Sequence, residues 1–163
     1  MGAILERMFV HNLWANLRLI DACAGLSQGS LDATVPGTYG TIRDTLAHLV
    51  GAEERYLSAF VGEQPTSPLQ REEVVGLPEL RELARRSGEG FVTAAARFHD
   101  DEVVHGVRRN GQPFALPAST LFLQAINHAT EHRAQVSTIL TQVGVEPPVM
   151  DGWTYDREQP VAP

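Results

Sequence analysis

Apolar residues recur at the three- and four-residue spacing of amphipathic helices in four stretches of the chain. The first stretch runs from about Ile4 to Leu26 and predicts a helix, with Gly25 and Gly29 as stops. Its apolar stripe consists of Val10, Leu13, Leu17, Ile20 and Ala24. Trp14 lies beside this stripe and is expected to pack against the core, because aromatic side chains dominate the energetics of packed interiors.

The second predicted helix begins at Thr41, because Asp44 three residues later completes a capping-box pattern, and it ends near Gly62. Its apolar stripe consists of Ile42, Leu46, Leu49, Val50, Leu57 and Phe60. His48 lies on the opposite side of this helix, among small and polar residues. That side either faces solvent or faces a pocket, and the small residue Ala52 favours a pocket.

Residues 62–76 carry prolines and charges and are expected to form a connection with little regular structure. The third helix starts near Pro78, which suits a first helical turn. Its apolar face consists of Leu80, Leu83, Ala84, Phe91, Ala94 and Phe98. Gly88 and Gly90 weaken the middle of this helix, so the sequence allows a local kink there.

Before the last helix, the helical spacing of apolar residues gives way to two short strand-like stretches. Val103–Val107 and Gln112–Leu116 flank Asn110-Gly111, a strong signal for a β-hairpin with a type I′ turn. The fourth helix is expected to start just past Pro117 and to stop at Gly144. The order of elements therefore predicts an all-α fold, a four-helix bundle with a short β-hairpin before the last helix.

The ends of the last helix leave two points open. Ser119 or Thr120 is available to cap its N-terminus. Beyond it, the tail from Val149 onward contains Trp153 and Tyr155, which are expected to anchor the tail to the body, although a lid over a site is the alternative.

Composition narrows the class of protein. The 163 residues (1–163) suit one domain, and a net charge of −7 argues against a nucleic-acid partner or an anionic membrane surface. No stretch approaches the roughly 18 apolar residues of a membrane-spanning helix. The single cysteine, Cys23, excludes an intrachain disulfide and a cysteine-rich zinc site, and it fits a reducing cytoplasm.

The candidate chemistry lies in the fourth helix. His128 and His132 are four residues apart, so their imidazoles lie on one helix face and can share a divalent metal ion. Two separately hydrogen-bonded core histidines are the alternative. With His48 from the second helix as a third ligand, the set matches catalytic metal sites that keep one position open. Gln135 lies on the same face as His132 and is placed to orient a ligand or substrate.

The same helix offers a hydrolytic alternative. His128, Glu131 and His132 form the pattern H-x-x-E-H, in which Glu131 would assist attack by metal-bound hydroxide. The remaining histidines do not fit a shared site. His11 is expected at the surface, and His99 and His105 are expected to be structural or exposed.

Three motifs are similar to those of a known family. They are Trp14-Ala15-Asn16, Thr45-Leu46-Ala47-His48-Leu49-Val50 followed by Glu53, and Asn127-His128-Ala129-Thr130-Glu131-His132-Arg133-Ala134-Gln135. Together with the order of elements, they resemble the DinB-like superfamily of four-helix-bundle metalloenzymes over about residues 4–155. The resemblance implies that His48, His128 and His132 bind the metal. Ala134 stands where the family often has glycine, which leaves these ligands unchanged.

Relatives in that superfamily include a mycothiol-dependent maleylpyruvate isomerase and bacillithiol S-transferases. The resemblance therefore implies a small-molecule substrate and a low-molecular-weight thiol activated by one divalent ion, which could be Zn, Ni, Fe, Mn or Co. The leading expectation is a metal-dependent thiol S-transferase with Glu131 and Gln135 as candidate catalytic residues. A metal-dependent hydrolase and a non-catalytic metal-binding stress-response protein are the alternatives. The resemblance also implies a homodimer, which light scattering can test.

Overall fold

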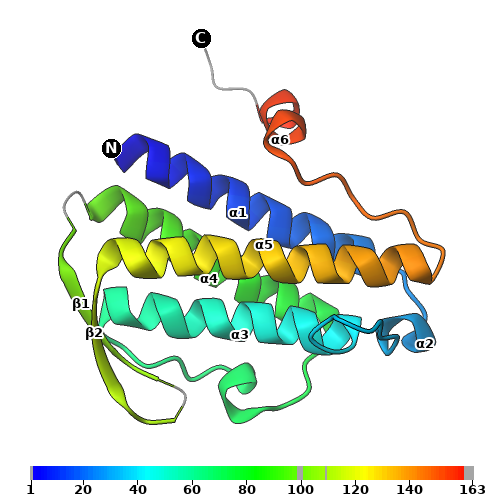
Figure 1. The fold of residues 1–163 in the computed structure, drawn as a ribbon, viewed down its shortest axis with the longest axis horizontal. Coiled ribbons are helices and arrows are strands. Elements are labelled where there is room, and N and C mark those ends of the chain that lie inside the picture. The colour runs from blue at the N-terminus through cyan, green and yellow to red at the C-terminus, as the bar shows by residue number, and fades with distance from the viewer. Residues whose placement is uncertain (1, 99–100, 109, 160–163) are drawn as a thin grey trace.

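The computed structural model describes residues 2–98, 101–108 and 110–159. Most of the chain forms four long helices, drawn in Figure 1 from blue to orange. They are α1 (Gly2–Cys23), α3 (Ile42–Val61), α4 (Leu77–Arg97) and α5 (Ala118–Gln142). Helix α1 packs against α4 and α5, and α3 packs against α4 and α5. The predicted four-helix bundle is therefore confirmed.

Shorter elements lie at the ends of the bundle. Strands β1 (Val103–Val107) and β2 (Pro113–Pro117) pair antiparallel as the predicted hairpin, at the end of the bundle where α5 begins (Figure 1). Three short elements lie in stretches that the sequence pattern left as loop or tail. They are α2 (Gln28–Leu31), the 3₁₀ turn η1 (Pro68–Arg71) and α6 (Gly152–Glu158). None of the described helices combines the length and apolar character that a membrane span requires.

The helix ends follow local chemistry, with one exception. The Thr41 hydroxyl accepts from the Asp44 backbone N–H, the Asp44 carboxylate accepts from the Thr41 N–H, and Gly62 ends the helix at a φ of 77°. The predicted capping box is therefore confirmed. Helix α5 differs, because the Asp101 carboxylate, rather than a side chain of α5 itself, accepts from the Ser119 backbone N–H and hydroxyl. This cap comes from a residue 18 positions earlier in the chain, which no local pattern reveals.

The hairpin turn corrects the expected turn type. The Arg108 backbone N–H donates to the Gln112 carbonyl, so the turn is longer than the two residues of a type I′ hairpin. Of the described turn residues, only Gly111 has a positive φ, at 81°, whereas a type I′ turn needs positive φ at both central positions. Gly111 therefore supplies the left-handed position of a longer turn.

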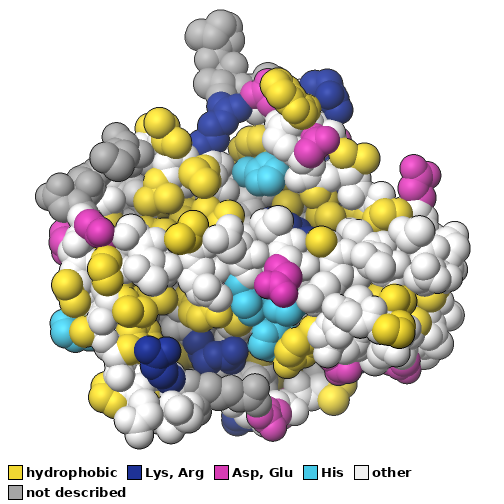
Figure 2. Space-filling model, in the orientation of Figure 1, with side chains coloured by type: hydrophobic (Ala, Val, Ile, Leu, Met, Phe, Trp, Pro, Cys, Tyr) yellow, Lys and Arg dark blue, Asp and Glu magenta, His cyan; other side chains and the backbone are white. Residues whose placement is uncertain are grey.

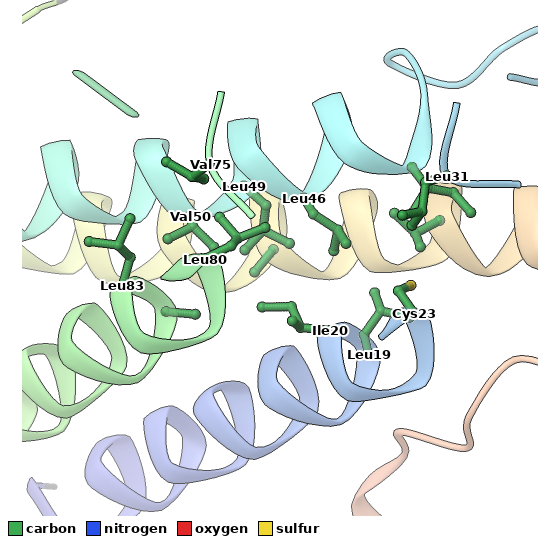
Figure 3. Close-up of a cluster of buried hydrophobic side chains, with 14 of the residues drawn as sticks. Leu19, Ile20, Cys23, Leu31, Leu46, Leu49, Val50, Val75, Leu80 and Leu83 are labelled. Carbon is green, nitrogen blue, oxygen red and sulfur yellow. The ribbon is translucent and has the colours of Figure 1, made fainter. Parts of the chain in front are cut away.

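The core has two apolar clusters with a polar layer between them. One cluster fills the half of the bundle next to α2 and includes Leu19, Cys23, Leu46, Leu80 and Leu83 (Figure 3). The other fills the hairpin half around a group of phenylalanines, Phe9, Phe60, Phe91 and Phe122. Between the clusters lie buried polar side chains from all four long helices, Asn12, Asn16, Glu53, Ser87 and Arg133, which we call the polar layer.

This layer explains why the predicted stripe of the first helix was displaced. The buried face of α1 includes Phe9, Asn12, Asn16, Leu19 and Cys23, each no more than 2% exposed. Val10, Leu13 and Leu17 border this face, and Ala24 is exposed. Because two asparagines occupy the centre of the buried face, a search for apolar periodicity assigns the stripe to the neighbouring positions.

Gly88 and Gly90 do not interrupt α4, which continues from Leu77 to Arg97. A Cβ atom at Gly88 would overlap the side chain of Leu13 on α1, and one at Gly90 would overlap Leu57 on α3. The glycines therefore allow two neighbouring helices to approach α4 closely. Their role is in packing.

The C-terminal tail packs on α1. The Tyr155 ring lies 5.4 Å from that of Trp14 and is buried, whereas Trp153 is 79% exposed. Tyr155 thus anchors the tail as predicted, and Trp153 does not. Met150 at the start of the tail accepts a hydrogen bond from His11 Nε2 at 3.0 Å.

Candidate metal centre

Three histidines meet where α3 faces α5. The Nε2 atom of His128 lies 3.1 Å from the Nε2 atoms of both His48 and His132. Ligand nitrogens of all three lie within 4.8 Å of one another, so this group could hold a metal ion. Figure 2 shows histidine side chains (cyan) at the surface in this region, between the positions of α5 and α3 in Figure 1. His48 is half-buried, lines a cavity and faces His128, so of the two alternatives the side of the helix that carries it faces a pocket.

Two of the three nitrogen–nitrogen distances are close to the spacing around one shared ion, and the third pair lies within 4.8 Å. Two nitrogens bound at about 2.0–2.1 Å to one tetrahedral ion are roughly 3.3 Å apart, close to the observed 3.1 Å. A neutral imidazole nitrogen is either a donor or an acceptor. His128 Nε2 therefore cannot form an optimal hydrogen bond with both neighbours at once. A shared cation uses all three lone pairs.

Gln135 sets the protonation of His132. The Gln135 side-chain oxygen accepts from the Tyr39 backbone N–H at 3.1 Å, which defines the orientation of the amide. The same oxygen lies 2.9 Å from His132 Nδ1, so this nitrogen must carry the proton. The lone pair of His132 is then on Nε2, which is the atom that faces His128. Gln135 thus fixes the tautomer of His132 in which Nε2 is free to bind a metal ion.

Aromatic rings enclose the histidines on two sides. The Tyr39 ring stacks on His48 with centroids 4.0 Å apart, and the Tyr56 ring meets His128 edge-on at 5.7 Å. Burial, together with the nearby positive charges that His132, His48 and Arg55 can carry, lowers the pKa of His128 to about 4. His128 is therefore neutral at pH 7, the state in which an imidazole binds a metal.

The polar layer lies directly behind the histidines. Arg133, the neighbour of His132, donates from Nη1 to the side-chain oxygens of Asn12 and Asn16, at 2.6 Å each. The amide nitrogens of the two asparagines donate to Glu53 Oε1 at 2.8 and 2.9 Å. Ser87 Oγ on α4 donates to Glu53 Oε2 at 3.3 Å. Two amides thus bridge a buried cation and a buried carboxyl group.

This bridge links the helices that carry the three histidines. Glu53 follows His48 on α3, Arg133 follows His132 on α5, and the asparagines join them through α1. Burial raises the pKa of Glu53 and lowers that of Arg133 to about 10. The asparagine amides and Arg133 favour the charged form of Glu53, and Glu53 favours the charged form of Arg133. The layer therefore couples the position of α3 to that of α5 at the level of the site.

The other residues singled out from the sequence do not belong to the group of three histidines. Glu131 and Asn127 are exposed on α5, and His105 is exposed on β1. His11 corrects the expectation of a surface residue, since it is half-buried beneath the C-terminal tail and burial lowers its pKa. His99 lies outside the described residues.

Two cavities adjoin the site. One of about 450 Å³ is lined by His48 and Tyr39 together with residues of α3 and of the segment that contains η1. The other, of about 420 Å³, lies between α3, α5 and the hairpin, and we call it the hairpin cavity. Tyr56, which contacts His128, lines the hairpin cavity, and Arg55 lines both. Both volumes suit small molecules.

Sequence reasoning missed several of these contributors. Asn12 and Ser87 were not singled out, and Asn16, Glu53 and Arg133 entered only as motif residues without a role. A signal was present, because two asparagines four residues apart interrupt an apolar face of α1. Tyr39 left no such signal, since its contact with Gln135 joins residues 96 positions apart.

A four-helix bundle that carries a group of three histidines, two from the last long helix, defines the class of protein. The sequence profile of the DinB family matches residues 1–161, and the chain belongs to this family. The fold is similar to the crystal structure of a DinB-like protein from Bacillus cereus ATCC 10987. The TM-score is 0.66 at 18% sequence identity, over 89% of this chain and 94% of that one. No curated protein matches the chain.

Proposed function

We propose that this protein is a metal-dependent thiol S-transferase that holds one divalent ion through His48, His128 and His132. The observation that carries the proposal is the convergence of three Nε2 atoms, one of them in a tautomer set by Gln135. A divalent ion at this site would lower the pKa of a bound thiol, so that the thiolate is available at neutral pH. Three nitrogen ligands accept Zn, Ni, Fe, Mn or Co.

The nucleophilic thiol must come from a small molecule. The only cysteine, Cys23, is fully buried in the apolar cluster of Figure 3, and burial raises the pKa of its thiol to about 12. A thiolate of Cys23 is therefore scarce at pH 7 and out of reach of a substrate. The cavities beside His48 and Tyr56 offer the space that an external thiol and an electrophile need.

In the transfer itself, the thiol sulfur forms a bond to an electrophilic carbon. The leaving group departs with the electrons of the bond that breaks, and the thiol proton passes to solvent. The chain contributes the Tyr39 ring stacked on His48 and the Tyr56 ring edge-on to His128, which limit water around the histidines. Gln135 keeps the lone pair of His132 directed inward. The hydrolytic alternative would need Glu131 as a base, and that residue is exposed on α5.

The test pairs metal-loaded protein with monochlorobimane and a panel of cellular thiols. We expect formation of the thiol–bimane conjugate and chloride above the uncatalysed rate with at least one thiol. We expect this activity to disappear after chelation and in His48→Ala. Metal content measured on untagged protein identifies the ion. Failure to exceed the uncatalysed rate with every thiol would contradict the proposal, whatever the metal content.

Gln135 provides a second test, of positioning. Gln135→Leu removes the oxygen that accepts from His132 Nδ1, and we expect metal affinity to fall by about 10- to 100-fold. Gln135→Glu keeps an oxygen at this position and should retain most of the affinity. Competition with a chromophoric chelator measures both variants. Equal metal affinity of Gln135→Leu and the wild type would show that Gln135 does not support His132 as a ligand.

A further inference from the structure

The helix faces that carry the histidines continue toward the hairpin. Arg55 and Tyr56 follow His48 by seven and eight residues on α3, and Gln124 precedes His128 by four on α5. These spacings keep the side chains near the faces that carry the histidines, about 6–12 Å further along the helix axes. All three side chains line the hairpin cavity. A small molecule with one end at the histidines can therefore extend its other end into this cavity.

The charge of the hairpin cavity is opposite to that of the protein. The chain carries 20 acidic and 13 basic residues, yet the described residues that line this cavity include two arginines and no acidic side chain. Arg55 Nη1 donates to the Gln70 side chain at 3.1 Å, a contact that holds the guanidinium group in place. Arg108 lies over the Phe114 ring at 5.6 Å and, among the described residues, forms no ion pair with a carboxylate.

The rest of the lining is largely apolar. Phe114 and Leu116 of β2, Val107 of β1 and Leu121 of α5 contribute hydrocarbon surface. A guanidinium group binds a carboxylate with two parallel hydrogen bonds, and such charge-assisted bonds strengthen where apolar walls exclude water. Positive charge at one point of an apolar cavity thus favours an organic acid over a neutral or cationic molecule.

We propose that the hairpin cavity binds the carboxylate of a small organic acid through Arg55 and Arg108, with its hydrocarbon part against Phe114, Leu116 and Leu121. The acid is a reactant of the transfer proposed above, and the inference rests on that function only in assigning its reacting end to the histidines. The carboxylate belongs either to the thiol or to the electrophile, and the experiment separates these sources.

The first arm uses metal-free protein and calorimetric titration with hexanoate and with hexan-1-ol. We expect hexanoate to bind at least about tenfold more tightly, because charge-assisted hydrogen bonds to arginine are strong. The preference should be lost in Arg55→Gln and in Arg108→Gln. Arg108 is exposed, so that variant should fold normally. Arg86→Gln, an exposed arginine on α4, is the matched control and should keep the preference.

Equal affinity for the acid and the alcohol would overturn the inference, as would an unchanged preference in both arginine variants. Because this arm contains no metal and no thiol, its result does not depend on whether the protein transfers thiols. Conversely, transfer that proceeds equally well with acidic and neutral reactants would support the proposed function and contradict the carboxylate site.

The second arm uses protein loaded with the metal and compares 6-mercaptohexanoate with 6-mercaptohexan-1-ol and hexanoate. If the carboxylate belongs to the thiol, the acid thiol bridges the histidines and the arginines, and it should bind at least about tenfold more tightly than either reference compound. If the carboxylate belongs to the electrophile, 6-mercaptohexanoate gains no affinity over the tighter reference compound. Either result supports the arginine site, provided that Arg108→Gln weakens the acid.

Discussion

Binding of a divalent ion is expected to fall by at least about 100-fold in His128→Ala, beyond the 10- to 100-fold typical of residues that only support a ligand. The Nε2 atom of His128 lies 3.1 Å from both other histidine nitrogens, so its loss removes the central member of the group. The fold should survive. His128 Nδ1 has no hydrogen-bond partner among the described residues, so the variant leaves no buried partner group unsatisfied there.

Two measurements check this result. Chelator competition gives the affinity, and thermal unfolding with and without metal gives the stabilisation by binding, about 2.7 kcal/mol when the free ion is at 100 times its dissociation constant. We expect wild type to show this stabilisation and His128→Ala to lose it. His105→Ala, an exposed histidine on the hairpin, is the control and should behave as wild type. Unchanged affinity in His128→Ala would exclude the three-histidine site.

Glu53→Ala is expected to destabilise the protein by about 3–5 kcal/mol, the usual cost of leaving a buried charge without its compensating group. Glu53 is fully buried and accepts from Asn12, Asn16 and Ser87. Its removal leaves both asparagine amides without their acceptor and the buried Arg133 without its counter-charge. Unfolding in urea measures the loss of free energy.

Glu53→Gln separates the charge from the hydrogen bonds. The glutamine oxygen can still accept from both asparagines, so we expect a smaller loss, about 1–3 kcal/mol. Glu131→Gln, an exposed glutamate on α5, is the control and should change stability by no more than about 0.5 kcal/mol. If Glu53→Ala lowers the free energy of unfolding by less than about 1 kcal/mol, the polar layer does not stabilise the bundle in the way that its hydrogen bonds indicate.

Much of the bundle follows from the sequence, because its signals are local. Apolar spacing located the four long helices, the capping box placed the start of α3 at Thr41, and Asn110-Gly111 placed the hairpin. The four-residue spacing of His128 and His132 similarly puts both on one face of α5. Failures occurred where partners are distant in sequence, as for the Asp101 cap of α5 and the tail that buries His11.

By itself, the sequence determined where the four long helices lie, to within a few residues, and that α5 presents a pair of histidines, since each depends on neighbours within a turn or two. Only the tertiary structure decided that His48 faces this pair, that Tyr39 and Gln135 set the tautomer of His132, and that the polar layer lies behind them. The physical reason is that helical periodicity records which faces are buried, whereas the contacts across the bundle depend on how separate helices pack.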